Sequence, residues 1–297
     1  MLYFVLMSAK NIKAYLQEHF PKEKAYIGAE EVRAFTRSLR IKVQELMMEL
    51  LPFAAEKAHP TISNYRVGVA GLTKNGSILL GCNLEMHGLH LNNSLHAEQF
   101  LVISSLIKKE ELSAIAVTAP PCGHCRQFLN EIKGGSKLRV LVAGEPERTL
   151  MELLPAPFGP SNLKINISLY EDRNNSLELK TPSNDPLIKE ALRQANNSYA
   201  PYSSCPSGIA IQLKNGAVVG GFYIENAAFN PSVSPMLSAL VHLISEGYDY
   251  KDIKEVALVE RKNSPVVQEH NVQDILNSIA PGTALKKQES IWSLISQ

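Results

Sequence analysis

A long internal repeat places the strongest limit on how this chain can fold. Residues 63–85 align with residues 203–225 at an offset of 140 and without gaps. A chain of 297 residues is long enough for about two domains, so the repeat predicts two copies of one domain. The matched positions are Gly68 with Gly208, Ala70 with Ala210, Lys74-Asn75-Gly76 with Lys214-Asn215-Gly216, Gly81 with Gly221, and Glu85 with Glu225.

The spacing of apolar residues predicts helices before the first copy and mixed structure within it. Three groups in the first 50 or so residues follow a helical face. Their members are Ile12, Tyr15, Leu16 and Phe20, then Val32, Phe35 and Leu39, then Val43, Leu46, Met47, Leu50 and Leu51.

From Tyr65 the period changes to that of strands. Residues 66–72 and 78–83 predict two strands joined across Asn75-Gly76, which is a strong hairpin signal because such turns need positive φ angles. A helix is expected from near His96 through Leu106, and a strand at 114–118. Pro121 then begins a second helix, with Cys122 in its first turn, and a strand follows at 138–142.

This alternation predicts an α/β fold: a three-layer α/β/α sandwich, duplicated, with a small N-terminal helical segment. We expect the helical segment at residues 1–45 and the first copy at 46–160. A polar linker should occupy 161–186, and the second copy 187–297.

The composition argues against a nucleic-acid partner, a membrane-spanning segment and a signal peptide. A net charge of +1 does not supply the broad attraction that nucleic-acid-binding proteins use against phosphate, so no nucleic-acid partner is expected. No apolar run reaches membrane-spanning length, and the apolar start at residues 2–7 lacks the basic region of a signal peptide. Four cysteines fit the reducing cytoplasm, where Cys82 and Cys205 are interpreted as small buried apolar residues.

The candidate catalytic and metal-binding residues lie in two separate segments of the first copy. His96-Ala97-Glu98 is followed by Pro121-Cys122-Gly123-His124-Cys125, in which Cys122 lies 24 residues after the glutamate. One imidazole and two thiolates suit tetrahedral zinc, and three protein ligands leave its fourth position to water. Both cysteines should lie at a helix N-terminus, which favours negative sulfur. The metal would then lie between two helix starts, with Glu98 placed to handle protons beside it.

Other interpretations of this cluster are weaker. A structural zinc knuckle needs a second pair of ligands at comparable spacing, which the sequence lacks, and a redox pair would leave His96 and Glu98 without a role. His124, next to Cys125, is interpreted as a packing or hydrogen-bonding residue. In the second copy the offset of 140 puts Met236 at the position of His96 and Ser238 at that of Glu98, so one zinc per chain is expected.

The H-x-E and P-C-x-x-C arrangement is the established signature of the zinc-dependent nucleobase deaminases. With the N-terminal helical segment, the sequence PCGHCRQF at 121–128 and the degenerate copy containing ENAAFNP at 225–231, the chain resembles the long, homodimeric bacterial cytidine deaminases. The resemblance implies zinc-dependent hydrolysis of cytidine and 2′-deoxycytidine to uridine and 2′-deoxyuridine plus ammonia. It also implies a role in pyrimidine salvage, a homodimer and no organic cofactor.

The resemblance assigns roles to particular residues. Asn83-Leu84-Glu85 matches the segment that binds the ribose hydroxyl groups in the family. Tyr65 takes a position where the family usually has a phenylalanine stacked on the pyrimidine, and tyrosine keeps the aromatic face. Phe158 resembles a residue that reaches the base from the neighbouring subunit, although a core or linker aromatic residue would give the same pattern.

Two rival functions follow from the same residues. A deaminase of nucleotides or of bases in RNA would need Arg or Lys around its substrate loops, whereas residues 87–93 offer only histidines. A catalytically silent zinc protein is the rival from another class. The complete set His96, Glu98, Cys122 and Cys125 in the first copy argues against it.

Overall fold

The computed structural model describes residues 9–21 and 23–293, so the apolar start at residues 2–7 lies outside the described residues. The helices are α1 (Ala9–His19), α2 (Ala29–Leu39), α3 (Val43–Glu56), α4 (Ala97–Lys108), α5 (Gly123–Leu129), α6 (Leu150–Leu153), α7 (Pro186–Asn197), α8 (Pro235–Ser245) and α9 (Glu269–Ile279). The strands are β1 (Tyr26–Ile27), β2 (Gly68–Thr73), β3 (Ile78–Cys82), β4 (Leu112–Val117), β5 (Arg139–Val142), β6 (Arg148–Thr149), β7 (Leu177–Leu179), β8 (Ser207–Leu213), β9 (Val218–Phe222), β10 (Ile253–Arg261) and β11 (Ala284–Trp292).

The strands form two sheets of the same plan, which confirms the duplication. The first has the order β1-β3-β2-β4-β5-β6 and the second β7-β11-β10-β8-β9. In the first sheet β2 is antiparallel to β3 and β4, and β4 is parallel to β5. In the second sheet β8 is antiparallel to β9 and β10, and β10 is parallel to β11. The predicted strands are found with ends shifted by one or two residues.

The predicted hairpin between β2 and β3 is present. The turn is closed by the Thr73 N–H, which donates to the Ser77 carbonyl at 2.9 Å, and Gly76 has φ +93°. The equivalent Gly216 of the second copy has φ +89°. The glycine, which pays no Cβ penalty there, is what the turn requires at this position.

Each sheet is covered on both faces, so the predicted three-layer sandwich is confirmed. Successive residues of β2 point to opposite faces: Val69 packs in the core that contains α4, and Ala70 in the core built by α1, α2 and α3. The second sheet is covered by α7 on one face and by α8 on the other.

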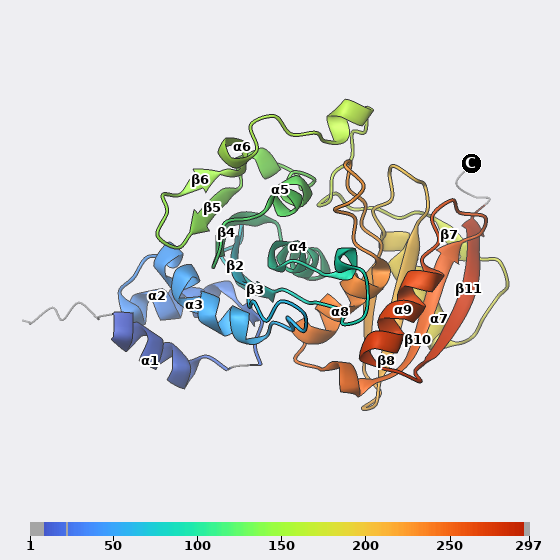
Figure 1. The fold of residues 1–297 in the computed structure, drawn as a ribbon, viewed down its shortest axis with the longest axis horizontal. Coiled ribbons are helices and arrows are strands. Elements are labelled where there is room, and N and C mark those ends of the chain that lie inside the picture. The colour runs from blue at the N-terminus through green and yellow to red at the C-terminus, as the bar shows by residue number, and fades with distance from the viewer. Residues whose placement is uncertain (1–8, 22, 294–297) are drawn as a thin grey trace, which may run out of the picture.

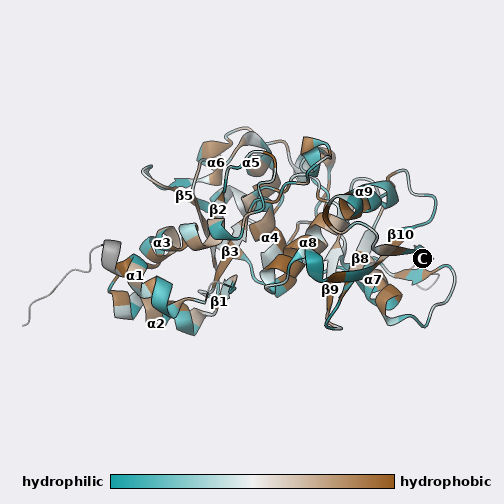
Figure 2. Ribbon diagram, turned by 60° about the horizontal axis from the view of Figure 1, so that its bottom comes forward, coloured by the Kyte–Doolittle hydropathy of each residue, from teal (hydrophilic) through white to brown (hydrophobic). Residues whose placement is uncertain are grey.

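The two sandwiches share their middle layer. Helices α4 and α8 pack against each other between the two sheets (Figure 1), and their apolar residues belong to one continuous core. Both helices are largely hydrophobic where they meet (Figure 2). Because each copy covers apolar surface of the other, the copies are a single packing unit and not two independent domains.

One pair of equivalent glycines in the repeat, Gly81 and Gly221, explains how closely α4 and α8 approach the sheets. A Cβ at Gly81 would lie 3.0 Å from the Ala97 carbonyl oxygen and 3.1 Å from the Leu101 nitrogen, so the backbone of α4 lies directly on β3. At the equivalent Gly221 a Cβ would lie 2.1 Å from the Ala239 nitrogen of α8. Gly81 therefore sets the position of the start of α4, where His96 and Glu98 are found.

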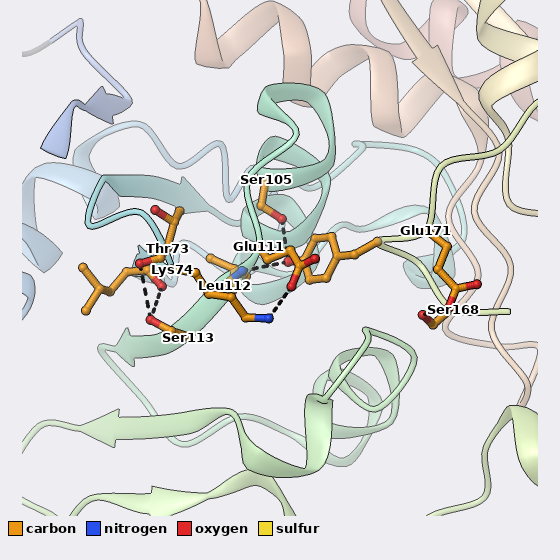
Figure 3. A network of polar contacts seen from close by, with 10 residues as sticks. Thr73, Lys74, Ser105, Glu111, Leu112, Ser113, Ser168 and Glu171 are labelled. Carbon is orange, nitrogen blue, oxygen red and sulfur yellow. Dashed lines mark hydrogen bonds and ion pairs between the residues drawn. The ribbon is translucent and has the colours of Figure 1, made fainter.

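The connection between the copies is more structured than a polar linker. Strand β7, within the predicted linker 161–186, pairs with β11 in the second sheet. The hydroxyl of Tyr170 bonds Ser105 Oγ at 2.8 Å and accepts from the Leu112 N–H at 3.4 Å, at the start of β4. Figure 3 shows Ser105 and Leu112 beside this segment. The predicted boundary at residue 45 falls inside α3, which packs on the first sheet. Among the described residues, no helix has the length and apolar character to cross a membrane.

Candidate active site

Two helix starts carry the predicted metal ligands. His96 is the N-cap of α4, and its backbone N–H donates to Gln99 Oε1 at 3.2 Å. Cys122 is the N-cap of α5, one residue before the first turn in which we expected it, and Cys125 lies within that turn. Arg126 anchors this start, because its Nε donates to the Pro121 carbonyl at 2.8 Å and its Nη1 to the Leu153 carbonyl at 2.9 Å.

The three ligand atoms have the separations that zinc requires. Cys122 Sγ and Cys125 Sγ lie 3.5 and 3.3 Å from His96 Nδ1, and 3.6 Å from each other. Tetrahedral zinc with bonds of about 2.3 Å to sulfur and about 2.1 Å to nitrogen needs about 3.8 Å between sulfurs and about 3.6 Å between sulfur and nitrogen. No other group of potential ligands is found among the described residues. The donor set and its spacing therefore fit one zinc ion.

His124 is not part of this cluster, as predicted. Its ring stacks on that of His96, with centroids 5.3 Å apart and an angle of 27° between the planes. Burial lowers the pKa of His124, which favours the neutral ring. Cys82 and Cys205 are buried and free, also as predicted.

The charge state of the cluster suits metal binding. The hydrogen bond from the Cys125 thiol, together with the bond to His96, lowers the pKa of Cys122 to about 3. The hydrogen bond to Cys122, together with burial, raises the pKa of Cys125. Glu98 is 4% exposed, and its burial raises the pKa of its carboxyl. A zinc ion would bind both sulfurs as thiolates.

A cavity of about 410 Å³ opens in front of the cluster. This volume lies in the range of small-molecule sites. Tyr65 lies at the cavity with 60% of its surface exposed, so an aromatic face is free there. The lining residues are Ser63, Tyr65, Val67, Asn83, Glu85, Leu91, Ser94, Leu95, His96, Ala97, Glu98, Ala119, Pro120 and Cys122.

The segment Asn83-Leu84-Glu85 presents alternate side chains to the cavity. Asn83 and Glu85 line it, whereas Leu84 is fully buried in the core. Asn83 is held by its neighbours: its Oδ1 accepts from the Val67 N–H at 2.9 Å, and its Nδ2 donates to the Tyr65 carbonyl at 3.0 Å. The assignment of Leu84 to substrate binding is corrected accordingly, because neighbours in an extended segment point to opposite sides.

Glu85 is hydrogen-bonded to a loop at residues 62 and 63, a contact that the sequence patterns did not predict. Its Oε2 accepts from the backbone N–H groups of Ile62 and Ser63, both at 2.8 Å, and its Oε1 from Ser63 Oγ at 2.5 Å. Burial alone would raise the pKa of Glu85, but these hydrogen bonds outweigh it and the pKa is lowered.

The second copy repeats this loop arrangement. Glu225 accepts from the backbone N–H groups of Tyr202 and Ser203 and from Ser203 Oγ. The paired serines at the start of the aligned repeat and the paired glutamates at its end were the available signal for this contact.

Phe158 does not line this cavity. Its side chain is 45% exposed, and its carbonyl oxygen accepts from Gln127 Nε2 at 2.6 Å. Within one chain it is therefore a surface aromatic residue next to α5, and a contact made from a neighbouring subunit stays a prediction.

Comparison with known proteins agrees with the geometry. Residues 41–141 match the family model described as the cytidine and deoxycytidylate deaminase zinc-binding region. Residues 150–273 match a second model of the same description, so that match begins before the predicted second copy at 187.

Relatives that match most of this chain are named cytidine deaminases. The cytidine deaminase of Enterobacter sp. (strain 638) is 38% identical over 252 residues, which is 84% of each chain. That of Cronobacter sakazakii is 39% identical over 251 residues, 84% of this chain and 83% of the relative. The crystal structure of cytidine deaminase from Mycobacterium tuberculosis is 32% identical, covers 39% of this chain and 97% of its own, and has a TM-score of 0.35. This chain belongs to the cytidine and deoxycytidylate deaminase family, with two copies of the family's domain on one polypeptide.

Proposed function

We propose that this chain hydrolyses cytidine and 2′-deoxycytidine to uridine and 2′-deoxyuridine plus ammonia, as a zinc enzyme of pyrimidine salvage. One observation carries the proposal. Two members of the zinc ligand set, His96 and Cys122, line one cavity together with the buried carboxyl of Glu98 and with Asn83 and Glu85, for which the resemblance implies a role in binding ribose.

Separate residues bind the metal and transfer protons. His96, Cys122 and Cys125 hold zinc, which when bound acts as a Lewis acid and lowers the pKa of a bound water towards about 7. Glu98, which is not a ligand, takes a proton from the attacking water and delivers it to N3 of the cytosine ring. It then takes the second proton from the hydroxyl group added at C4 and passes it to the amino group, which leaves as ammonia when the C4–N bond breaks. Its burial keeps bulk water from competing for these protons.

The sugar and base are held on the other side of the cavity. The Asn83 amide donates to a ribose hydroxyl group, the Glu85 carboxylate accepts from one, and the exposed ring of Tyr65 stacks on the pyrimidine. Because Asn83 is itself hydrogen-bonded by two backbone groups, its amide is already oriented before substrate enters.

A free nucleoside is favoured over a nucleotide. None of the described residues that line the cavity is a lysine or an arginine, so nothing there neutralises a phosphate. The same observation disfavours a base within RNA, whose backbone brings phosphates on both sides of the target.

We also propose that the chain acts as a cytoplasmic homodimer, in which residues 187–297 of the same and the neighbouring chain help enclose each site. Exposed apolar side chains support a further contact: Phe158 is 45% exposed, Ile167 47% and Phe229 67%. The division into a helical segment, a catalytic copy, a connection and a degenerate copy also stays a proposal.

The test is direct. Purified protein is incubated with cytidine, cytosine and CMP, and the products are separated and quantified. Cytidine should be converted to uridine with a higher kcat/KM than either alternative. The Glu98→Gln variant, which keeps the shape of the side chain, should retain zinc and lose turnover. More efficient conversion of CMP or cytosine would defeat the nucleoside assignment.

A further inference from the structure

The degenerate copy contacts both helices that carry the zinc ligands. After β9, residues 225–231 of the second copy correspond to residues 85–91 of the first, which contribute Glu85 and Leu91 to the cavity. In the second copy this loop instead packs against α4 and α5 of the first. We call residues 226–231 the brace loop.

One end of the brace loop is bonded to α5. Asn226 is completely buried, and its Nδ2 donates to the Gln127 carbonyl at 3.1 Å and to Glu131 Oε2 at 3.0 Å. Its Oδ1 accepts from Gln127 Nε2 at 3.3 Å. Gln127 follows the ligand Cys125 by two residues within the same helix. The side chain of Asn226 is therefore bonded to α5 within one turn of the ligand Cys125.

Glu131 strengthens this attachment, because every hydrogen-bond partner of its buried carboxylate among the described residues comes from the second copy. Oε1 accepts from the hydroxyls of Tyr199, at 2.8 Å, and Tyr202, and Oε2 accepts from Asn226 Nδ2 and from the Ala227 N–H at 3.1 Å. Four donors satisfy the roughly four lone-pair sites of an ionised carboxylate. Since Glu131 is only 1% exposed, removing one donor leaves buried charge without compensation.

The other end of the brace loop is bonded to α4 through Gln99. Gln99 Nε2 donates to the Pro231 carbonyl at 3.0 Å, and Gln99 Oε1 accepts from the backbone N–H of His96 at 3.2 Å. Gln99 is 2% exposed, so both bonds are shielded from water. One buried amide thus links the zinc ligand His96 to the second copy.

We propose that the brace loop is a positioning element of the zinc site, with Asn226, Glu131 and Gln99 as its positioning residues. Hydrogen bonds that hold metal ligands near their bound positions raise metal affinity, because less ordering is then needed when the metal binds. Here the ligands come from two separate helices, and the brace loop is bonded to both. The degenerate copy has thus exchanged a substrate loop for a support of the neighbouring metal site.

The first experiment exchanges an amide and a carboxylate. Asn226→Asp keeps an acceptor for Gln127 Nε2 but turns the other atom into an oxygen that faces the Glu131 carboxylate and the Gln127 carbonyl. In Glu131→Gln two donors face each other, because the new side-chain amide lies opposite the amide of Asn226. In the double variant the new amide at position 131 donates to the new carboxylate at position 226, although the Gln127 carbonyl and the Ala227 N–H stay unmatched.

The readout is the rate at which zinc passes to an excess of a colorimetric chelator, measured well below the unfolding temperature. Loss of a group that orients metal ligands typically costs about 10- to 100-fold in metal affinity or activity. We expect each single variant to release zinc about ten-fold faster or more, and the double variant to recover a large part of that change. The matched control is Ser245→Ala, which removes the contact between Ser104 Oγ and Ser245 Oγ at the far end of α4 and should leave zinc release unchanged.

The proposal would be overturned if Asn226→Asp released zinc at the wild-type rate and only its unfolding temperature fell. The contacts would then stabilise the packing of the two copies without positioning the zinc ligands. If Asn226→Asp does not fold, Gln99→Met decides: faster zinc release supports the proposal and an unchanged rate refutes it. The residue roles rest on the proposed function, but zinc release needs no substrate. A protein that shows these zinc effects and does not deaminate cytidine would refute only the function.

Discussion

Replacing Glu85 tests how the site recognises the sugar. A carboxylate has about four lone-pair sites. Three are already used, by the N–H groups of Ile62 and Ser63 and by the Ser63 hydroxyl. One site remains for the substrate, so the structure allows Glu85 a single hydrogen bond to a ribose hydroxyl.

The expected loss follows from that count. A hydrogen bond to a charged group contributes about 1.5–3 kcal/mol. This corresponds to about 10- to 150-fold in kcat/KM, because each 1.36 kcal/mol is tenfold. Glu85 is partly exposed to solvent in the free protein, so Glu85→Ala should fall near the lower end, at about ten-fold. Glu85→Gln should lose less, since its amide can donate to Ser63 Oγ and still offer a hydrogen to the sugar.

The assay compares two substrates. Initial rates are measured for cytidine and, at high protein concentration, for cytosine, which has no sugar. Glu85→Ala should lower kcat/KM for cytidine and leave that for cytosine unchanged. Ser63→Ala, which removes one loop bond but keeps the carboxylate, is the matched control and should retain most activity on cytidine. An equal fall for both substrates would refute the reasoning, because the carboxylate would then act only through the loop.

The remaining predictions concern the metal, the proton and the second copy. Metal analysis should find one zinc per chain, and Cys122→Ala or Cys125→Ala should lose zinc and activity together; two zincs per chain would contradict the assignment. Glu98→Ala should keep zinc and the unfolding temperature while turnover falls by about 10²- to 10⁴-fold or more, and near-normal turnover would defeat the proton-transfer role. Truncation after about residue 180 should give a chain that aggregates or has little activity, because it exposes the face of α4 that packs on α8; a soluble, fully active truncation would contradict the shared core.

Much of the fold could be predicted because its signals are local. The turn at Asn75-Gly76 needs a positive φ, and Gly76 adopts one. Helix starts at His96 and near Cys122 follow from capping positions and from Pro121. The spacing of the cysteines within one helical turn brings two sulfurs to one point, so the sequence was sufficient for most of the ligand set.

Contacts between distant segments were decided only by the tertiary structure. The alternation of side chains in an extended segment does not show which face is buried. For this reason Leu84 was assigned to substrate binding, whereas its side chain packs in the core. The partners of Glu131 lie 68 to 96 residues away along the chain.

The repeat by itself determined that there are two copies and that only the first keeps zinc ligands. It did not determine that α4 and α8 share one core, or that the brace loop is bonded to both ligand-bearing helices. The physical reason is that a motif depends on residues close together in the sequence. Burial and hydrogen-bond pairing depend on which residues of distant segments pack against the motif in the folded layers.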